Sequence, residues 1–203
     1  EIRTYEADLN LTWLYQMHWG VRVSVCIEGK YTNGTRVDRV YKNPSLSPSV
    51  SHPRLTILVL DIETDYKAAT VFAISLVLHG PGGQSAEQIH LVGRPHAGDT
   101  KGIRCHADEP ALLRAVATTI RDWDPDILTG WNVIDFDVPV LQRRFRAHGI
   151  PFTIGRSEET VKVREGRSWG GSRVVVPGRQ VLDALHLVRA TTQRFDDYRL
   201  DTV

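Results

Sequence analysis

The residues best suited to chemistry are two carboxylates, Asp61 and Glu63, at the end of the apolar run 55–60. A continuous apolar run of this kind is typical of a strand in the centre of a mixed α/β sheet. Because side chains alternate along a strand, Asp61 and Glu63 are predicted to lie on the same face. Adjacent carboxylates repel each other unless they share a cation or a proton, and such oxygen ligands suit Mg²⁺ or Mn²⁺. A strand end that simply reaches solvent is the alternative interpretation.

A third carboxylate, Asp137, closes the segment 131–137 (WNVIDFD), immediately before a predicted helix. A negative charge is electrostatically favoured at a helix N-terminus, so helix capping is the alternative to a chemical role. Asp135 is the competing acid in this segment. It comes two residues earlier and is expected to face away from Asp137.

The elements expected to position these acids begin with three strands in a meander. They are residues 55–60, 71–78 and 88–92. A helix is predicted to open at Asp108, a good N-cap residue, and to show one apolar face. A short strand over residues 127–131 then leads to a second helix over residues 138–148. Three strands followed by helix, strand and helix predict an α/β fold with a mixed sheet flanked by helices.

Residues 1–53 are predicted to form a small β-rich unit. Strands are expected on both sides of the tight-turn pair Asn33-Gly34, over residues 21–27 and 35–41. The segment 43–53 holds three prolines and four serines without periodicity, which indicates a linker or surface loop. We therefore place a domain boundary after residue 53, with a second domain over residues 54–203.

The composition narrows the class of protein. The chain has 203 residues, of which 41% are hydrophobic and 24% charged, as is typical of a globular protein rather than a disordered one. No apolar run approaches the roughly 18–20 residues that span a bilayer, so no membrane partner is expected. The two cysteines, Cys26 and Cys105, lie far apart without a CxxC motif, which favours reduced thiols over a disulfide or a zinc site.

The charge is unevenly distributed along the chain. Residues 55–137 carry 12 acidic and 6 basic side chains, whereas residues 138–195 carry 4 acidic and 11 basic ones. An acidic segment beside a basic one suits a cation-dependent site that acts on a polyanion. A solvated surface with uneven charge is the alternative.

Several segments, in this order, resemble family B DNA polymerases. Segment 60–64 (LDIET) resembles their first exonuclease motif, and segment 131–137 resembles their second. Segments with similar flanking positions are residues 124–130, 178–183 and 198–203. Residues 5–8 and the Asn33-Gly34 pair are similar to the N-terminal domain of the bacterial DNA polymerase II branch. The resemblance thus covers nearly the whole chain.

This resemblance implies a ribonuclease H-like fold of the DEDD exonuclease type and two-metal hydrolysis of the 3′-terminal phosphodiester of single-stranded DNA. By similarity, Asp61 bridges two Mg²⁺ or Mn²⁺ ions, Glu63 helps to hold the metal on the nucleophile side, and Asp137 serves the second metal. The residues implied to contact the substrate are Ile62, Thr64, Asn132 and Phe136. For Phe136, a place in the core is slightly favoured over this role.

The resemblance also implies partners and a setting. The partners are the single-stranded 3′ end of a primer strand, the polymerase domain of a longer parent chain and a sliding clamp reached through that parent. The implied location is cytoplasmic and nucleoid-associated. The rival interpretations are a stand-alone DEDD-type exonuclease acting on RNA or DNA, and a nucleic-acid-binding scaffold that has lost the chemistry.

The family has a third motif, a tyrosine with an aspartate four residues later, which supplies the fourth acid. Tyr198 and Asp201 stand one residue too close, and the Asp197–Asp201 pair lacks the tyrosine. Asp183 precedes the expected position of the motif, so we expect the motif beyond residue 203. On this interpretation the chain is an excised fragment with weak or no nuclease activity. The polymerase motifs of the family are also absent, so nucleotide addition is expected only of the parent.

Basic residues follow the second motif and predict a surface for DNA. They are Arg143, Arg144, Arg146, Arg156, Lys162, Arg164, Arg167 and Arg173. A β-hairpin is expected, with residues 161–164 and 173–176 as its arms and Trp169 in its loop. An exposed tryptophan in a basic loop can stack on an unpaired base, so Arg164, Trp169 and Arg173 are the predicted DNA contacts. The alternative interpretation, which the sequence favours equally, is a solvated hairpin with Trp169 folded onto the core.

Overall fold

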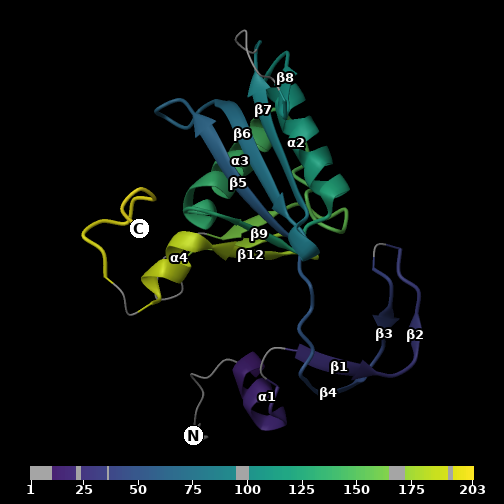
Figure 1. Cartoon of the computed structure of the whole chain (residues 1–203). Helices are drawn as coiled ribbons and strands as arrows, with labels where there is room; N and C mark the ends of the chain where they lie inside the picture. Colours follow the sequence, from purple (N-terminus) through teal and green to yellow (C-terminus); the bar gives the residue numbers. More distant parts are fainter. Residues whose placement is uncertain (1–10, 22–23, 36, 95–100, 165–171, 192–193) are drawn as a thin grey trace, which may run out of the picture. The chain divides into compact units, whose positions relative to one another are not determined.

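The computed structural model describes residues 11–21, 24–35, 37–94, 101–164, 172–191 and 194–203. The chain divides into two compact units, Glu1–Arg54 and Leu55–Val203 (Figure 1). The resemblance noted for residues 5–8 and the predictions for Arg167 and Trp169 lie outside the described residues.

The first unit contains a short helix and two small antiparallel sheets. Helix α1 spans Leu11–Trp19. Strand β1 (Ser24–Glu28) pairs with β4 (Ser45–Ser49), and β2 (Tyr31–Thr32) pairs with β3 (Val40–Tyr41). Helix α1 was not predicted, because its sequence has neither a polar face nor an acidic first turn to signal a helix.

The structure corrects two predictions for this unit. The segment 43–53 is not a plain linker, because β4 occupies its middle and runs in register with β1 from Ser24↔Ser49 onward. A two-stranded sheet has only edge strands, so Pro48 needs no partner for its missing N–H. The strand predicted over residues 35–41 is also too long. Of its described residues, only the last two pair, so Asn33-Gly34 does not form a two-residue turn between paired strands.

The second unit is built on a mixed sheet. Among the described residues it has six strands in the order β12-β9-β5-β6-β7-β8. The predicted meander is confirmed, because β5 (Ile57–Thr64), β6 (Val71–His79) and β7 (Ser85–Val92) pair antiparallel in sequence. Strand β9 (Ile127–Gly130) lies parallel to β5, and two further strands extend the edges in parallel pairings. These are β12 (Gln180–Asp183) beside β9 and β8 (Ile103–His106) beside β7.

Both predicted helices are present. Helix α2 spans Glu109–Trp123, and the Asp108 carboxylate caps it by accepting the Ala111 N–H at 2.8 Å. Helix α3 spans Val138–Ala147. A short helix, α4 (Ala184–Arg189), follows β12, and a 3₁₀ turn, η1 (Pro81–Gly83), separates β6 from β7. None of the described helices has the length and apolar character that a membrane crossing requires.

The core lies between the sheet and these helices. Leu58, Leu60 and Ile62 of β5 are buried in one hydrophobic cluster with the apolar faces of α2 and α3. The rings of Phe145 on α3 and Phe152 stack in this cluster with centroids 4.4 Å apart. Beyond α3, the predicted hairpin is also confirmed as β10 (Lys162–Arg164) paired with β11 (Arg173–Val175).

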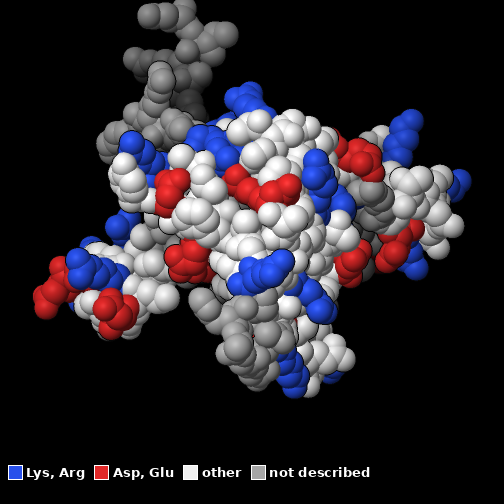
Figure 2. All heavy atoms as spheres, turned by 90° about the horizontal axis from the view of Figure 1, so that it is seen from above, with Lys and Arg blue, Asp and Glu red and all other residues white. Residues whose placement is uncertain are grey.

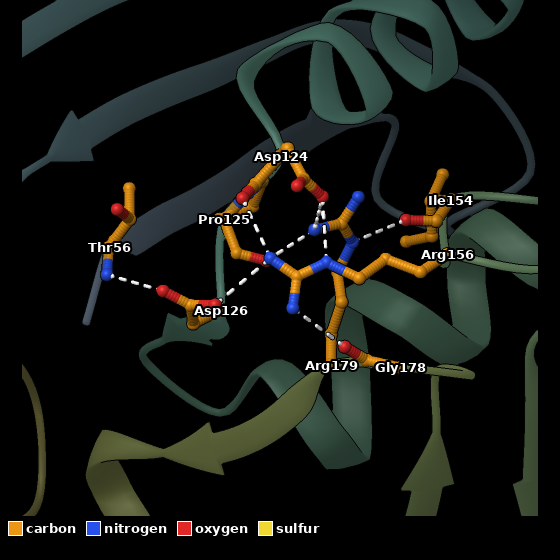
Figure 3. A network of polar contacts seen from close by, with 8 residues as sticks. All are labelled: Thr56, Asp124, Pro125, Asp126, Ile154, Arg156, Gly178 and Arg179. Carbon is orange, nitrogen blue, oxygen red and sulfur yellow. Dashed lines mark hydrogen bonds and ion pairs between the residues drawn. The ribbon is translucent and has the colours of Figure 1, made fainter. Parts of the chain in front are cut away.

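Two arginines hold the beginnings of the three parallel strands together (Figure 3). The Arg179 guanidinium donates to the Ile154 carbonyl at 2.8 Å, to the Pro125 carbonyl and to Asp124 at 2.8 Å. Arg156 donates to Asp124 and Asp126 at 2.8 and 2.9 Å. The second oxygen of Asp126 accepts the N–H of Thr56, just before β5, at 2.9 Å. The network thus fixes the strands at the end opposite to Asp61 and Glu63.

Candidate active site

Strand β5 presents Asp61 and Glu63 on one face. Its burial alternates along the strand, with Leu58, Leu60 and Ile62 buried and both acids exposed. The prediction that the two carboxylates share a face is therefore confirmed. Burial raises the pKa of Asp61, and the charge of Glu63 raises it further. The charge of Glu63 thus makes ionisation of Asp61 harder, as is expected beside a like charge.

A bulge lies at the end of this strand. Glu63 stands opposite Ala73 of β6, whereas Thr64 stands opposite Val71, so the register shifts between them and Phe72 is the extra residue. Bulges commonly redirect side chains beside active sites. The shift lies immediately after Glu63, which itself remains in register with β6.

Asp137 reaches the site through an irregular turn. Strand β9 ends at Gly130, where any Cβ would collide with the Leu60 carbonyl, so β9 and β5 can approach closely only with glycine there. Asn132 has a left-handed conformation (φ 63°) and starts a single turn of π-helix, η2 (Val133–Asp137). Such turns are rare and often occur at functional sites. Sequence reasoning predicted a helix start here but not this turn.

The side chain of Asp137 is buried, with 2% of its surface exposed. Its Oδ1 accepts the N–H of Ile62 at 3.2 Å, so the peptide that follows Asp61 is bonded directly to Asp137. The carboxylate makes no capping hydrogen bond to α3, which contradicts the capping alternative. Burial, helped by the charge of Asp61, raises the pKa of Asp137 to about 7.

Asp135 is engaged elsewhere. Its Oδ2 lies 2.7 Å from Nε2 of His186 on α4. Hydrogen bonding from Ser172 and then from His186 holds the pKa of Asp135 below its usual range. This acid therefore interacts with groups other than those around Asp137, as its position two residues earlier indicated.

A fourth acid, Asp183, lies at the end of β12 and is buried. Its Oδ1 accepts the N–H groups of Leu185, Asn132 and His186 at 2.9, 3.2 and 3.3 Å, and Oδ2 accepts the N–H of Ile134 at 2.9 Å. One carboxylate thus caps α4 and holds the η2 turn. Sequence reasoning missed this role, although an aspartate between a strand and an apolar helix start is a recognisable N-cap signal. With four backbone donors, Asp183 is a structural acid.

The other predicted contact residues are placed as follows. The Phe136 ring is 39% exposed, so the slightly favoured interpretation as a core residue is wrong. The side chain of Ile62 is buried, and the Thr64 hydroxyl donates to the carbonyl of Asp65 at 2.9 Å. Arg164 and Arg173 are exposed cross-strand partners in the hairpin.

Part of the predicted basic surface is neutralised. Arg144 pairs with Glu109 at 2.6 Å, Lys162 pairs with Glu159 at 2.7 Å, and Arg156 belongs to the network at the strand beginnings. On the face shown in Figure 2, Lys and Arg side chains are interspersed with Asp and Glu. The charge separation along the sequence therefore does not become a single-sign field on this face.

Asp61, Glu63 and Asp137 have carboxylate oxygens that could bind a cation. In the described part of the chain, no group of three or more His, Cys, Asp or Glu side chains is placed to hold a metal ion. The charges of Asp61 and Glu63 interact, as do those of Asp61 and Asp137. Hard oxygen ligands with an uncompensated charge fit Mg²⁺ or Mn²⁺ chemically. The three acids therefore fit a divalent cation by donor type, without forming a closed cage.

The fold and these acids define a member of a known class. Residues 2–203 match the family described as DNA polymerase family B, exonuclease domain. The chain belongs to this family.

Known relatives agree with this assignment. The chain is 28% identical to DNA polymerase II of Escherichia coli (strain K12) over 208 residues, which covers all of this chain and 25% of that protein. It is 27% identical to a DNA polymerase of Thermococcus sp. (strain 9oN-7), covering 78% of this chain and 20% of that one. The chain therefore spans a quarter or less of the length of these relatives.

A solved structure has the same fold. The family B DNA polymerase of Pyrobaculum calidifontis matches with a TM-score of 0.66 and 20% sequence identity, covering 95% of this chain and 24% of that one. The sequence identity is low, so this match concerns the fold alone.

Proposed function

We propose that this chain acts as a 3′→5′ proofreading exonuclease that removes the 3′-terminal nucleotide of single-stranded DNA by hydrolysing its phosphodiester. The observation that carries the proposal is the coupling of exposed Asp61 to buried Asp137, whose pKa is raised to about 7. A buried acid beside a like charge destabilises a fold unless a cation or a proton is bound, so Asp137 is a candidate for a functional site. The family assignment supports DNA as the substrate.

The same proposal covers the architecture. The mixed sheet with β5 at its centre supports a ribonuclease H-like fold of the DEDD type. The division near residue 54 supports an N-terminal piece of the polymerase over residues 1–53 and an exonuclease domain over residues 54–203. Nucleotide addition, the polymerase domain and a sliding clamp are proposed only for a longer parent chain.

Asp61, Glu63 and Asp137 would hold the divalent cations. When bound, two such ions would supply a metal-bound nucleophile and stabilise the leaving oxygen of an in-line displacement. The chain's own residues do the remaining work. Asp61 and Glu63 project from a rigid central strand, and the Ile62 N–H holds one oxygen of Asp137 in place. Asp137 therefore meets the cation with its position already fixed.

Substrate would be oriented by groups around these acids. Phe136 is exposed directly beside Asp137 and can stack on the terminal base. Asn132, which begins the η2 turn, and Thr64, at the end of β5, are the proposed polar contacts. The side chain of Ile62 packs in the core on the face of β5 opposite to the acids, so its proposed contribution is its backbone N–H. The exposed pair Arg164 and Arg173 would contact the phosphate backbone.

A fourth acidic ligand is proposed to come from a segment outside these 203 residues. Asp183 is committed to four backbone N–H groups and is not available as that ligand. We therefore expect weak or no hydrolysis by this chain alone. The lack of a described three-ligand cluster favours a second candidate, a catalytically weak nucleic-acid-binding fragment. A stand-alone exonuclease is less favoured, because each of the relatives above extends well beyond the matched region.

The test is hydrolysis of a 3′-labelled single-stranded oligonucleotide in Mg²⁺ or Mn²⁺. The chain is compared with a version extended by a segment that carries the proposed Tyr-x-x-x-Asp motif, and each is compared with its Asp61→Ala variant. Asp122→Ala, an exposed acid on α2, is the matched control. We expect robust cleavage from the extended chain and its loss in Asp61→Ala only. Equal cleavage by the Asp61→Ala and Asp122→Ala variants would refute the proposal.

A further inference from the structure

A second buried acid, Glu109, lies outside the acids of the site. It is the first residue of α2, and 8% of its surface is exposed. Its two oxygens make polar contacts with three residues. Oε1 accepts the Val71 N–H at 2.9 Å and Arg144 Nε at 2.8 Å, whereas Oε2 accepts Arg144 Nη2 at 2.6 Å and lies 2.7 Å from Nε2 of His148. This carboxylate is therefore fully engaged without being a ligand candidate.

The first connection leads to the strand pair that carries Glu63. Val71 opens β6 and stands opposite Thr64, immediately past the bulge after Glu63. In an antiparallel pair a partner strand normally supplies the acceptors. Here the Val71 N–H bonds to the Glu109 side chain, so that carboxylate determines where β6 begins. The position of the bulge, and through it the end of β5, depends on this bond.

The second connection leads to the helix that follows Asp137. Arg144 lies on α3 and His148 is its C-cap residue, so both move with the helix whose first residue follows Asp137. Arg144 also acts on the loop after β5, because its charge contributes to lowering the pKa of Asp65. Glu109 therefore joins α3 to the beginning of β6 through one side chain.

Electrostatic interactions strengthen the hydrogen bonds of Glu109. Burial alone would raise the pKa of Glu109, but hydrogen bonds from Arg144, His148 and the Val71 N–H outweigh it and lower the pKa to about 2. The contact with Arg144 is bidentate and charge-assisted, the geometry that gives the most rigid side-chain pairing. The carboxylate is thus ionised, and both connections hold, throughout the neutral pH range.

We infer that Glu109 is a positioning residue for the proposed nuclease site, holding the strand pair that carries Asp61 and Glu63 at a fixed spacing from the helix that follows Asp137. The inference rests on the proposed function for the meaning of the site. The spacing can be measured independently of function. The Ile62 N–H donates to Asp137 between the strand pair and the helix, so its exchange rate reports on that spacing. A loosened spacing should open that hydrogen bond first.

The test compares Glu109→Gln with Asp122→Asn, an isosteric change at an exposed position of the same helix. Amide hydrogen exchange is followed at Ile62 and at Ile89 of β7, a strand that is separated from β5 by β6. We expect Glu109→Gln to accelerate exchange at Ile62 at least several-fold relative to Ile89, and Asp122→Asn to change neither. A purely structural contribution would accelerate both sites together through global unfolding. Equal acceleration at Ile62 and Ile89 would overturn the inference.

A second readout concerns the cation. Mn²⁺ affinity is measured by paramagnetic resonance of the unbound ion. We expect Glu109→Gln to weaken Mn²⁺ binding about tenfold, the effect typical of groups that orient ligands. If Glu109→Gln does not fold, His148→Gln, which removes one outer bond, should show the same effects in weaker form. If the Asp61→Ala variant binds Mn²⁺ as tightly as the wild-type chain, the proposed function is contradicted. Unchanged Ile62 exchange in both variants would contradict the inference alone.

Discussion

The backbone N–H of Ile62 donates a hydrogen bond of 3.2 Å to Oδ1 of Asp137. Ile62 stands between the two acids of β5, and Asp137 closes the η2 turn, so this bond joins residues 75 positions apart in the chain. It turns two separate sequence motifs into one site. The chemical meaning of that site depends on how these acids respond to protons and cations.

Asp137→Asn should stabilise the chain when divalent cations are removed. The pKa of Asp137 is raised to about 7 from an ordinary 3.8, so its ionised form disfavours folding, and stability falls as the pH rises through this window. Asparagine keeps the acceptor for the Ile62 N–H without the charge. We expect a melting temperature about 3 to 6 °C higher at alkaline pH in EDTA, equivalent to about 1 to 2 kcal/mol.

The gain in melting temperature from Asp137→Asn should be smaller at about pH 5, where the Asp137 carboxyl of the wild-type chain is protonated in the folded state. Asp122→Asn is the control and should change the melting temperature at neither pH. A gain of the same size at both pH values would show that the charge of Asp137 is not its cause.

His90 should make the fold sensitive to mild acid. It is buried at 2% exposure, with Nδ1 3.0 Å from Nε2 of His106. Burial, helped by His106 and Arg104, lowers the pKa of His90 to about 4 from 6.5. The folded state therefore binds fewer protons than the unfolded one, and stability that is complete above pH 6.5 is lost as the pH falls towards 4. The titration of Asp137 acts in the opposite direction over the same pH range, so the Asp137→Asn variant is the background for this measurement. In that background, urea unfolding should show a loss of about 2 kcal/mol between about pH 7 and pH 5.

In the same Asp137→Asn background, His90→Gln should make the chain less stable at neutral pH but should remove most of this acid dependence. The titration of Glu109 lies outside this pH range. Its pKa is lowered to about 2 from 4.5, so its contribution to stability is lost only below pH 4.5. An acid dependence of the same slope in His90→Gln would contradict the assignment to His90.

Phe136 should contribute to DNA binding rather than to stability. Its ring is 39% exposed beside Asp137, so Phe136→Ala should leave the melting temperature nearly unchanged. Loss of a stacked base should weaken binding of a short single strand by about 1 to 3 kcal/mol, measured by fluorescence anisotropy in EDTA. Leu55→Ala, at an exposed position before the opposite end of β5, is the control. Equal affinities of the two variants would remove the stacking role of Phe136.

The hairpin should contribute electrostatically. Changing both Arg164 and Arg173 to Gln should weaken single-strand binding at low salt and reduce the slope of log affinity against log salt by about 1.4, as expected for two lost phosphate contacts. Lys162→Gln is the matched control on β10, because Glu159 already pairs with Lys162 at 2.7 Å. A slope unchanged in the double variant would place the DNA elsewhere.

The sequence was sufficient for the elements with strong periodic or capping signals. The meander, the Asp108 cap and the shared face of Asp61 and Glu63 all follow from local rules. Strands β8 and β12 were missed as strands because each has only four residues and polar side chains interrupt its apolar positions. Parallel pairings with β7 and β9 place them. Local pattern carries little information about such pairings.

The details of the site were harder to predict than its residues. The bulge after Glu63 arises from how β6 begins, which depends on Glu109 in a helix 38 residues later. The π-turn before Asp137 depends on the left-handed Asn132 and on the Asp183 carboxylate of another strand. Phe136 was slightly favoured as core because it is apolar, whereas its exposure follows from that turn. In each case a tertiary contact decided the local geometry.

The measurement that addresses the central claim most directly is Mn²⁺ binding to the 203-residue chain and to its Asp61→Ala, Asp137→Asn and Asp122→Ala variants. The claim is that Asp61, Glu63 and Asp137 together form the cation site of the proposed exonuclease. We expect wild type and Asp122→Ala to bind Mn²⁺ with the same affinity, and each of the other two variants to bind about tenfold or more weakly. Equal affinity in all four proteins would contradict the account, because these acids would then not act as one site.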